Sequence, residues 1–405
     1  MDRPPPLPLD LPKTSFQTSR RDFLEKALLT LGGWALHIGD LGGKVCRAGA
    51  TPKAGSDMVF SGSGPASPAD GIQSAPTAIA PPSAPPLEKT PIVDTHLHLW
   101  DLKKLRLPWL RQGDPLCRDH LLEEYLREAE GLNIVQAVYM EVDVHDEDLV
   151  KEAEYVLELC QKKGLLVGAV LGGRPGTPQF APYIRRFKDS PWVKGVRRIP
   201  RDGNTAVWLE KPFIQDIRLL GELGMSFDLC MPPQRLPDAA KLVDACPETR
   251  FVLDHCGNAD PLAFAAGRAK KESQSNGGKS SASSGAAGFP SRAPAHDPEQ
   301  WRRDIAQLAR REQVVCKISG IIARAEKDRW TPEDLAPIVQ HCLEVFGPDR
   351  VIFASDWPVC TRTASLRQWV LALKEIVRGR SDVDNGKLFY QNAVRFYRLE
   401  GKTSR

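Results

Sequence analysis

The sequence predicts an α/β protein with a (β/α)8 barrel over residues 91–398, and three observations carry that prediction. Apolar runs bounded by Gly and Pro alternate with helically periodic segments, as in parallel βα units. Eight such runs occur, each followed by a helical segment. The span, less a low-complexity insertion, is close to the roughly 250 residues of a typical barrel. A doubly wound open sheet is the alternative, but no Gly-rich phosphate loop follows any expected strand.

The expected elements follow in chain order. The strands are Ile92–Leu99, Val135–Val142, Leu165–Leu171, Val193–Ile199, Met225–Met231, Arg250–His255, Val314–Ile318 and Arg350–Ser355. Helices expected between and after them include Asp148–Lys162, Phe213–Leu223, Leu236–Cys246, Trp301–Arg310, Pro332–Phe346 and Leu366–Val377. Because active sites of such barrels lie at the C-terminal ends of the strands, polar residues at those ends become candidates for chemistry.

Composition excludes several classes of protein. With 41% hydrophobic residues among 405, the chain has enough apolar material for a large core, so a wholly disordered protein is excluded. The formal charge of +4 comes from 55 basic and 51 acidic residues, so no nucleic-acid partner is expected. No run approaches the roughly 18 apolar residues of a transmembrane helix. The nine cysteines form no C-x-x-C pair, which favours buried thiols over a disulfide framework.

Residues 1–50 are expected to form a twin-arginine export signal. Arg20 and Arg21 precede the modest apolar run Ala27–Ile38, and Ala48–Ala50 provides an Ala-x-Ala cleavage site. This pattern predicts a periplasmic or otherwise exported protein. An amphipathic N-terminal helix with a chance arginine pair, and hence a cytoplasmic protein, is the alternative.

Two low-complexity segments are expected to lack a packed core. Residues 51–90, rich in Pro, Ala and Ser, read as a disordered linker. Residues 265–294, rich in Ser, Gly, Ala and Lys, read as an insertion within the barrel, because the same βα pattern continues on both sides. Residues 399–405 form a short C-terminal tail.

The strongest chemical signal is a pair of histidines at the end of the first expected strand. Asp94, His96 and His98 alternate in the sequence, so their side chains are expected on one face, with Asp94 one step deeper in the barrel. Two imidazoles on one face of a strand can converge on one divalent cation. The alternative is a pair of structural histidines.

Two further strand ends carry candidates. His255, in Asp254–Gly257 after the sixth strand, is expected to be a third metal ligand or a group that polarises a carbonyl. Asp356, in Ser355–Pro358 after the eighth strand, is expected to act as a general base toward water. The alternative for Asp356 is an N-cap of the following helix.

Five weaker candidates accompany these residues. Glu141 after the second strand is expected to be either a metal ligand or an ion-pair partner. Arg197 and Lys194 on the fourth strand are candidates to bind an anionic or hydroxyl-rich substrate. Trp100 and Trp357 lie near the same barrel mouth, where their rings would pack against a sugar ring or simply fill the core.

The combined motifs resemble the amidohydrolase-related lactonases of the amidohydrolase superfamily. The resemblance rests on Ile92–Asp101, Val193–Arg197, Leu253–Gly257, Cys316–Gly320 and Phe353–Pro358, in this order, and covers about residues 91–398. It implies a barrel that hydrolyses a cyclic ester, most simply a sugar-acid lactone. The sequence departs from the family pattern at Asn258-Ala259 and in the 265–294 insertion.

The resemblance also implies roles for the candidate residues. Asp356 would activate water, His96, His98 and His255 would bind a metal or polarise the lactone carbonyl, and Arg197 would hold the substrate. The implied cofactor is a divalent metal, zinc first, although some relatives work without one.

No G-x-S-x-G nucleophile motif occurs, which disfavours an acyl-enzyme and favours direct attack by water. A decarboxylase or other hydrolase of the superfamily, and a non-catalytic carbohydrate-binding barrel, are the alternatives; the oligomeric state is left open.

Overall fold

The computed structural model describes residues 84–162, 164–200, 203–264 and 295–399. The expected signal segment 1–50, most of the expected linker 51–90 and the expected insertion 265–294 lie outside these ranges, as does nearly all of the C-terminal tail. Within the described ranges, no helix is both long and apolar enough to cross a membrane.

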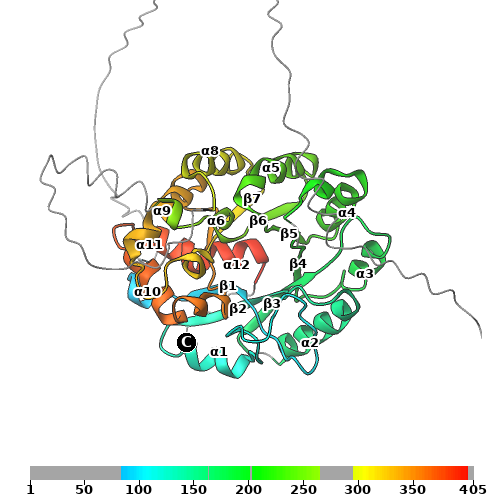
Figure 1. Ribbon diagram of the computed structural model, residues 1–405, viewed down its shortest axis with the longest axis horizontal. Helices are drawn as coiled ribbons and strands as arrows, with labels where there is room; N and C mark the ends of the chain where they lie inside the picture. Colours follow the sequence, from blue (N-terminus) through cyan, green and yellow to red (C-terminus); the bar gives the residue numbers. More distant parts are fainter. Residues whose placement is uncertain (1–83, 163, 201–202, 265–294, 400–405) are drawn as a thin grey trace, which may run out of the picture. The chain divides into compact units, whose positions relative to one another are not determined.

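Eight parallel strands form one sheet whose spatial order is the chain order, as Figure 1 shows. The first and last strands meet through a bridge between Leu97 and Trp357, and the Asp356 N–H donates to the His96 carbonyl at 2.9 Å. These contacts close the sheet into the expected (β/α)8 barrel. The strands are β1 (Ile92–Leu97), β2 (Ile134–Met140), β3 (Leu166–Gly172), β4 (Val193–Arg197), β5 (Ser226–Leu229), β6 (Arg250–Leu253), β7 (Val314–Ile318) and β8 (Val351–Phe353).

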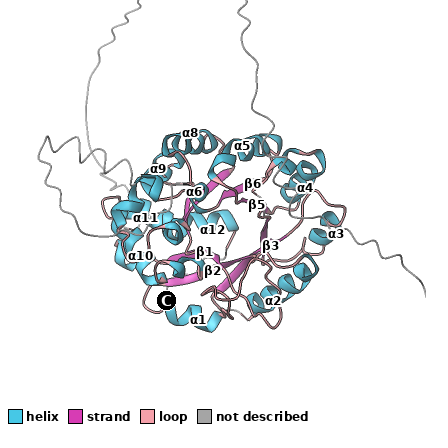
Figure 2. Ribbon diagram, viewed as in Figure 1, coloured by secondary structure: helices cyan, strands magenta, loops and turns pink. Residues whose placement is uncertain are grey.

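Helices surround the strands as an outer ring (Figure 2). Their amphipathic faces bury apolar residues against the barrel, as Leu335, Val339 and Leu343 do in the capped helix that follows β7. The helices are α1 (Leu122–Ala129), α2 (Leu149–Gln161), α3 (Phe180–Arg185), α4 (Lys211–Glu222), α5 (Leu236–Ala245), α6 (His255–Asn258), α8 (Pro298–Ala309), α9 (Pro332–Phe346), α10 (Leu366–Ile376), α11 (Asp382–Gly386) and α12 (Asn392–Tyr397).

Most of the expected strands extend too far toward their C-terminal ends. The strand expected to reach Leu99 ends at Leu97, the one expected to reach His255 ends at Leu253, and the one expected to reach Ser355 ends at Phe353. At these points the backbone leaves the ladder, so that His98, His255 and Asp356 lie in the turns just beyond the strands. These turns place the polar side chains at the barrel mouth.

A bulge in β1 corrects one expectation from the sequence. Asp94 pairs with Ala137 and Leu97 pairs with Tyr139, so β1 contains one more residue than β2 between these pairs. An extra residue inverts the side-chain alternation. Asp94 therefore faces outward, where Tyr125 of α1 donates a hydrogen bond to it at 2.6 Å, while His96 faces inward. The expectation that Asp94 lies below His96 on the same face is wrong.

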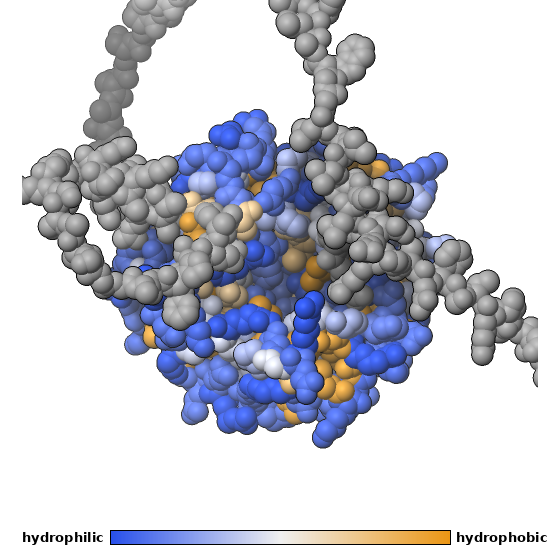
Figure 3. All heavy atoms as spheres, in the orientation of Figure 1, coloured by the Kyte–Doolittle hydropathy of each residue, from blue (hydrophilic) through white to orange (hydrophobic). Residues whose placement is uncertain are grey.

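The N-terminal end of the barrel is filled by apolar side chains and covered by α12. Inward-facing residues of six strands form a buried cluster with three residues at the end of the chain: Val93, Val138, Met140, Val170, Val252, Val315, Ile352, Ala393, Tyr397 and Leu399. Asn392 of α12 donates to the Val351 carbonyl at 2.8 Å, at the first residue of β8. In the orientation of Figure 1, the described surface is mostly hydrophilic, with hydrophobic residues showing in several separate patches (Figure 3).

Candidate active site

Three of the residues selected from the sequence meet at the C-terminal mouth of the barrel. The Nε2 atoms of His96 and His98 lie 3.1 Å apart. Asp356 Oδ1 lies 3.3 Å from His98 Nε2 and 3.7 Å from His96 Nε2. His98 and Asp356 are 6% and 4% exposed, and His96 is fully buried. The structure thus brings together residues selected from opposite ends of the barrel domain.

The spacing of these three atoms fits a tetrahedral divalent ion. Metal–nitrogen bonds of about 2.0–2.1 Å in tetrahedral geometry place two ligand atoms about 3.3 Å apart. The three separations here are 3.1, 3.3 and 3.7 Å. Two imidazole nitrogens and one carboxylate oxygen are also a donor set typical of zinc. The side chains therefore fit a divalent metal with few shifts, and a fourth position would remain for water or substrate.

Hydrogen bonds to the other ring nitrogens orient the two histidines. His98 Nδ1 lies 3.0 Å from the Met140 carbonyl, which only accepts, so Nδ1 carries the proton and Nε2 has a free lone pair. His96 Nε2 lies 3.1 Å from Arg197 Nη1, and His96 Nδ1 lies 3.4 Å from Asp254 Oδ1 and 3.3 Å from Lys317 Nζ, so charged groups hold both ring nitrogens. Burial keeps the pKa of His96 well below its usual value, so the ring is neutral and suited to bind a metal.

A layer of buried charges lies beneath the histidines. Lys317 of β7 is fully buried and pairs with Asp228 of β5 at 2.6 Å and with Asp254 at 3.1 Å. Burial alone would raise the pKa of Asp254, but the charge of Lys317 and the His96 ring hold it well below its usual range. Asp254 therefore remains an anion and can accept the Nδ1 proton of His96. A carboxylate behind a metal-binding histidine fixes its tautomer and raises its basicity.

His255 reaches the same mouth through a left-handed turn. The φ angles of His255, Cys256, Gly257 and Asn258 are 54°, 52°, 66° and 56°. Left-handed backbone costs roughly 1–2 kcal/mol for each non-glycine residue, and such strain is concentrated at functional sites. A Cβ at position 320 would collide with the His255 ring, so Gly320 allows the close approach.

The His255 ring is held in place by a serine from the next strand end. Nδ1 lies 3.0 Å from Ser319 Oγ, and Nε2 lies 4.0 Å from Asp356 Oδ1. Burial lowers the pKa of His255, so this ring is also neutral. His96, Asp254 and His255 form a second group of possible ligand atoms that overlaps the first at His96.

Glu141 and Arg197 form a buried ion pair, which matches one of the two roles expected for Glu141. Arg197 Nε donates to Glu141 Oε1 at 2.6 Å, and Nη2 donates to the Glu141 carbonyl at 2.8 Å. A third nitrogen of Arg197, Nη1, lies 3.4 Å from Asp254. Most of the guanidinium fork is therefore used within the protein, although Arg197 also lines the cavity. Its contact with substrate stays a prediction.

The structure corrects three expected substrate contacts. Lys194 faces away from the mouth, because its aliphatic chain packs over Gly168 of β3. Trp100 and Trp357 are fully buried in the core, and the Trp100 indole donates to the Arg118 carbonyl at 2.6 Å. Neither tryptophan lines the cavity at the mouth; that position is taken by Trp109.

A cavity of about 590 Å³ opens above the site. His98, His255 and Asp356 provide polar groups in its lining, and Trp109, Val142 and Val359 are among its apolar walls. Arg324 and Asn258, both overlooked in the sequence, also line it and contact each other at 3.3 Å. The cavity is large enough for a small cyclic substrate, and its polar groups converge on the candidate metal position.

Fold and site together define a barrel protein with a histidine–aspartate centre suited to a divalent metal. Residues 93–276 and 286–399 match the Amidohydrolase family, and the chain belongs to this family. It is 26% identical to an uncharacterised protein of Sinorhizobium fredii over 76% of this chain and 98% of that protein. It is 23% identical to an L-fucono-1,5-lactonase of Burkholderia multivorans over 76% of this chain and 96% of the enzyme.

A solved structure shows the same fold. It is an amidohydrolase from Burkholderia multivorans with bound zinc, superposed with a TM-score of 0.62 at 22% identity over 76% of this chain and all of the other. Family membership and these relatives support a hydrolase. The buried histidine–aspartate cluster, in turn, makes the barrel mouth a candidate site for a divalent metal.

Proposed function

We propose that the protein hydrolyses a lactone, with water attacking the ring carbonyl directly at the barrel mouth. The observation that carries this proposal is the position of Asp356. Asp356 lines the cavity, and its Oδ1 lies within 4.0 Å of three imidazole nitrogens, from His96, His98 and His255. A carboxylate in this position can accept a proton from water beside the groups that polarise a carbonyl. The lactonase relative supports the same reaction class.

The residues of the chain supply the proton transfers. Asp356 takes the proton of the attacking water as the oxygen bonds to the acyl carbon. The ring C–O bond then breaks, and the proton passes from Asp356 to the leaving alkoxide. When Ser319 donates to His255 Nδ1, the His255 proton is on Nε2 and is directed toward the mouth, where it stabilises the developing oxyanion. No covalent acyl-enzyme is needed.

The metal in this proposal is zinc, held by His96, His98 and Asp356. A divalent ion bound there supplies Lewis-acid polarisation of the substrate or of water. His98 is oriented by the Met140 carbonyl, which leaves its Nε2 lone pair for the ion, whereas His96 Nε2 would have to exchange its contact with Arg197 for the ion. Asp254 is itself tied to Lys317 and Arg197, so contacts within the protein fix the position of the carboxylate behind His96.

The proposed substrate is a sugar-acid lactone. The indole of Trp109 lines the cavity and can pack against the C–H face of a sugar ring, and His98, His255 and Asp356 contribute polar groups to the same lining. Arg324 lines the same cavity. A guanidinium there can hold a ring hydroxyl or the carboxylate that ring opening creates.

The direct test is hydrolysis of a panel of aldonolactones by the full-length protein, measured as acid release with a pH indicator. The proposal expects turnover of at least one sugar lactone by the wild type and loss of that turnover in Asp356→Asn. The matched control is Asp101→Asn, a partly exposed aspartate outside the cavity lining, which should retain wild-type turnover. Bound zinc with no lactone turnover, but with release of carbon dioxide from an aromatic acid, would refute the proposal and select a decarboxylase.

We also propose that the protein is exported through its N-terminal twin-arginine segment. Arg20 and Arg21 are the residues on which this rests. Replacing both with Lys should retain the protein in the cytoplasm of a bacterial host, measured by fractionation. Unchanged export of the double variant would contradict the proposal.

A further inference from the structure

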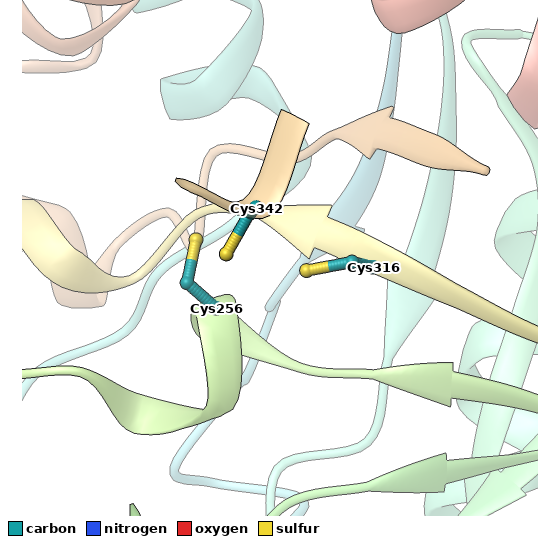
Figure 4. A group of neighbouring side chains, drawn as sticks. All are labelled: Cys256, Cys316 and Cys342. Atoms are coloured by element: carbon teal, nitrogen blue, oxygen red, sulfur yellow. The ribbon is translucent and has the colours of Figure 1, made fainter. Parts of the chain in front are cut away.

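Three buried cysteines form a cluster behind the His255 turn that the proposed reaction does not use. Cys256 lies in α6, Cys316 in β7 and Cys342 in α9, and all three are fully buried. Figure 4 shows the side chains coming from three separate elements with their sulfur atoms gathered together. Their Sγ atoms lie within 4.8 Å of one another, and all three residues are free thiols.

The cluster differs from the other buried thiols of the described residues. Four other buried free thiols occur, and none belongs to a group of three possible ligand atoms: Cys160, Cys230, Cys246 and Cys360. The thiols of Cys256 and Cys316 lie 3.6 and 3.8 Å from one acceptor, the Lys317 carbonyl. Burial among apolar side chains alone would not require three sulfur atoms from three elements to converge.

The spacing suits a single thiophilic ion. Bonds to sulfur of about 2.3 Å place three sulfur atoms roughly 3.5–4 Å apart around one centre. Sulfur atoms already within 4.8 Å of one another need only small side-chain rotations to reach this arrangement. Thiolates select soft ions over hard ones, which excludes magnesium and calcium as occupants.

The surroundings decide the charge of the ion. All three cysteines belong to the main hydrophobic core, where a net charge is costly. The adjacent charges in the chain, Lys317 and Asp254, pair with each other at 3.1 Å and leave no unbalanced cation. Three thiolates around a monovalent ion carry two negative charges, and around a divalent ion they carry one. Around a trivalent ion the complex is neutral.

We propose that Cys256, Cys316 and Cys342 form a binding site for a trivalent thiophilic metalloid, with arsenic(III) as the probe. Arsenous acid exchanges its three hydroxyl groups for the three thiols. Three As–S bonds form, three As–O bonds break, and each thiol proton leaves with a hydroxyl as water, so no electron is transferred. The product is a neutral As(S-Cys)3 group within the core.

The test uses the full-length protein, fully reduced beforehand, incubated to equilibrium with arsenite and then desalted. We expect one arsenic per chain by elemental analysis. Intact mass should rise by one arsenic less three hydrogens, and three fewer thiols should react after denaturation. Cys342→Ala leaves only two of the three ligands and should reduce arsenic retention at least tenfold. Cys246→Ala removes a buried thiol outside the cluster and should retain one arsenic per chain.

Absence of bound arsenic in the wild type, or equal retention by Cys342→Ala, would overturn the proposal. Circular dichroism of the alanine variants shows whether each is folded; if Cys342→Ala does not fold, Cys316→Ala takes its place with the same expectation. Because the readout is binding and mass, it does not depend on the proposed lactonase reaction, and failure of one does not imply failure of the other.

Discussion

The two ends of the barrel are built from the same eight strands and have opposite character. At the N-terminal end, inward-facing Val138, Val252 and Ile352 pack against α12. At the C-terminal end, inward-facing His96, Lys317 and Asp254 pair with one another instead. The apolar end needs only close packing, whereas each polar group at the mouth needs a partner to offset its burial. The difference shows how one scaffold combines an apolar, packed end with a polar end suited to chemistry.

Asp356→Asn should impair catalysis at the mouth and leave the packing of the apolar end unchanged. Asparagine has nearly the same shape but cannot act as a general base, so lactone hydrolysis should fall by about 10²–10⁴-fold. Thermal unfolding should stay close to that of the wild type. The comparison is between initial rates at saturating lactone for the two proteins; a variant with near-normal turnover would remove Asp356 from the mechanism.

Lys317→Met should lower the free energy of unfolding by disturbing the charge layer at the mouth. It leaves Asp228 and Asp254 without their buried cation, which costs about 3–5 kcal/mol in free energy of unfolding. Lys194→Met, on the outer face of the same barrel, is the matched control and should cost less than about 1 kcal/mol. Urea denaturation of the two variants measures the difference. Equal stabilities would mean that the charge layer does not hold the mouth together.

Glu152→Gln should change how the free energy of unfolding depends on pH, because it removes a titrating group near the mouth. Burial, followed by the charge of Glu141, raises the pKa of Glu152 from 4.5 to about 8. Between these values the folded protein holds a proton that the unfolded chain has released. The free energy of unfolding therefore falls as pH rises from about 5 to about 8. The variant should escape this loss and exceed the wild type at pH 8 by on the order of 1–3 kcal/mol.

The measurement for Glu152 is urea denaturation of both proteins at several pH values across this range. The gap between the variant and the wild type should widen as pH rises. If instead the two stability profiles run parallel, Glu152 is ionised in the folded protein and its proposed titration is wrong.

Ile352→Val should have the smallest effect and act only on the apolar end. Removing one methylene group from the packed interior costs about 0.5–1.5 kcal/mol. Because Ile352 belongs to the apolar cluster and does not line the cavity, turnover per folded molecule should not change. A fall in the rate of lactone hydrolysis in this variant, at a temperature where it is fully folded, would show that the two ends are coupled.

The sequence was sufficient for the fold and for the residues with a local signature. Alternating apolar runs gave all eight strands, and the H-x-H spacing and the Asp356 motif marked two strand ends whose side chains do meet. Asp228 lies in β5, Lys317 lies in β7 and Asp254 follows β6, and the pairing of these three neighbouring strands brings them together. No local pattern distinguishes such a buried ion pair from charges at a barrel end.

Other differences arise from packing that the sequence does not display. The bulge in β1 changes the face of Asp94 through one unpaired residue, which leaves the apolar pattern unaltered. Trp100 and Trp357 stand next to site residues in the chain, yet both fill the core. Arg324 reaches the cavity from the 3₁₀ helix Ile321–Arg324 after β7, where no motif surrounds it.

The most direct test of the central claim is a zinc titration of the metal-stripped full-length protein with lactone hydrolysis as the readout. The account predicts that activity rises with added zinc and saturates at one zinc per chain. His98→Asn should neither retain zinc nor recover activity, while His145→Asn, at an exposed histidine, should behave as the wild type does. Full hydrolysis by the stripped protein, unchanged in His98→Asn, would contradict the assignment of the mouth as a metal-dependent hydrolytic site.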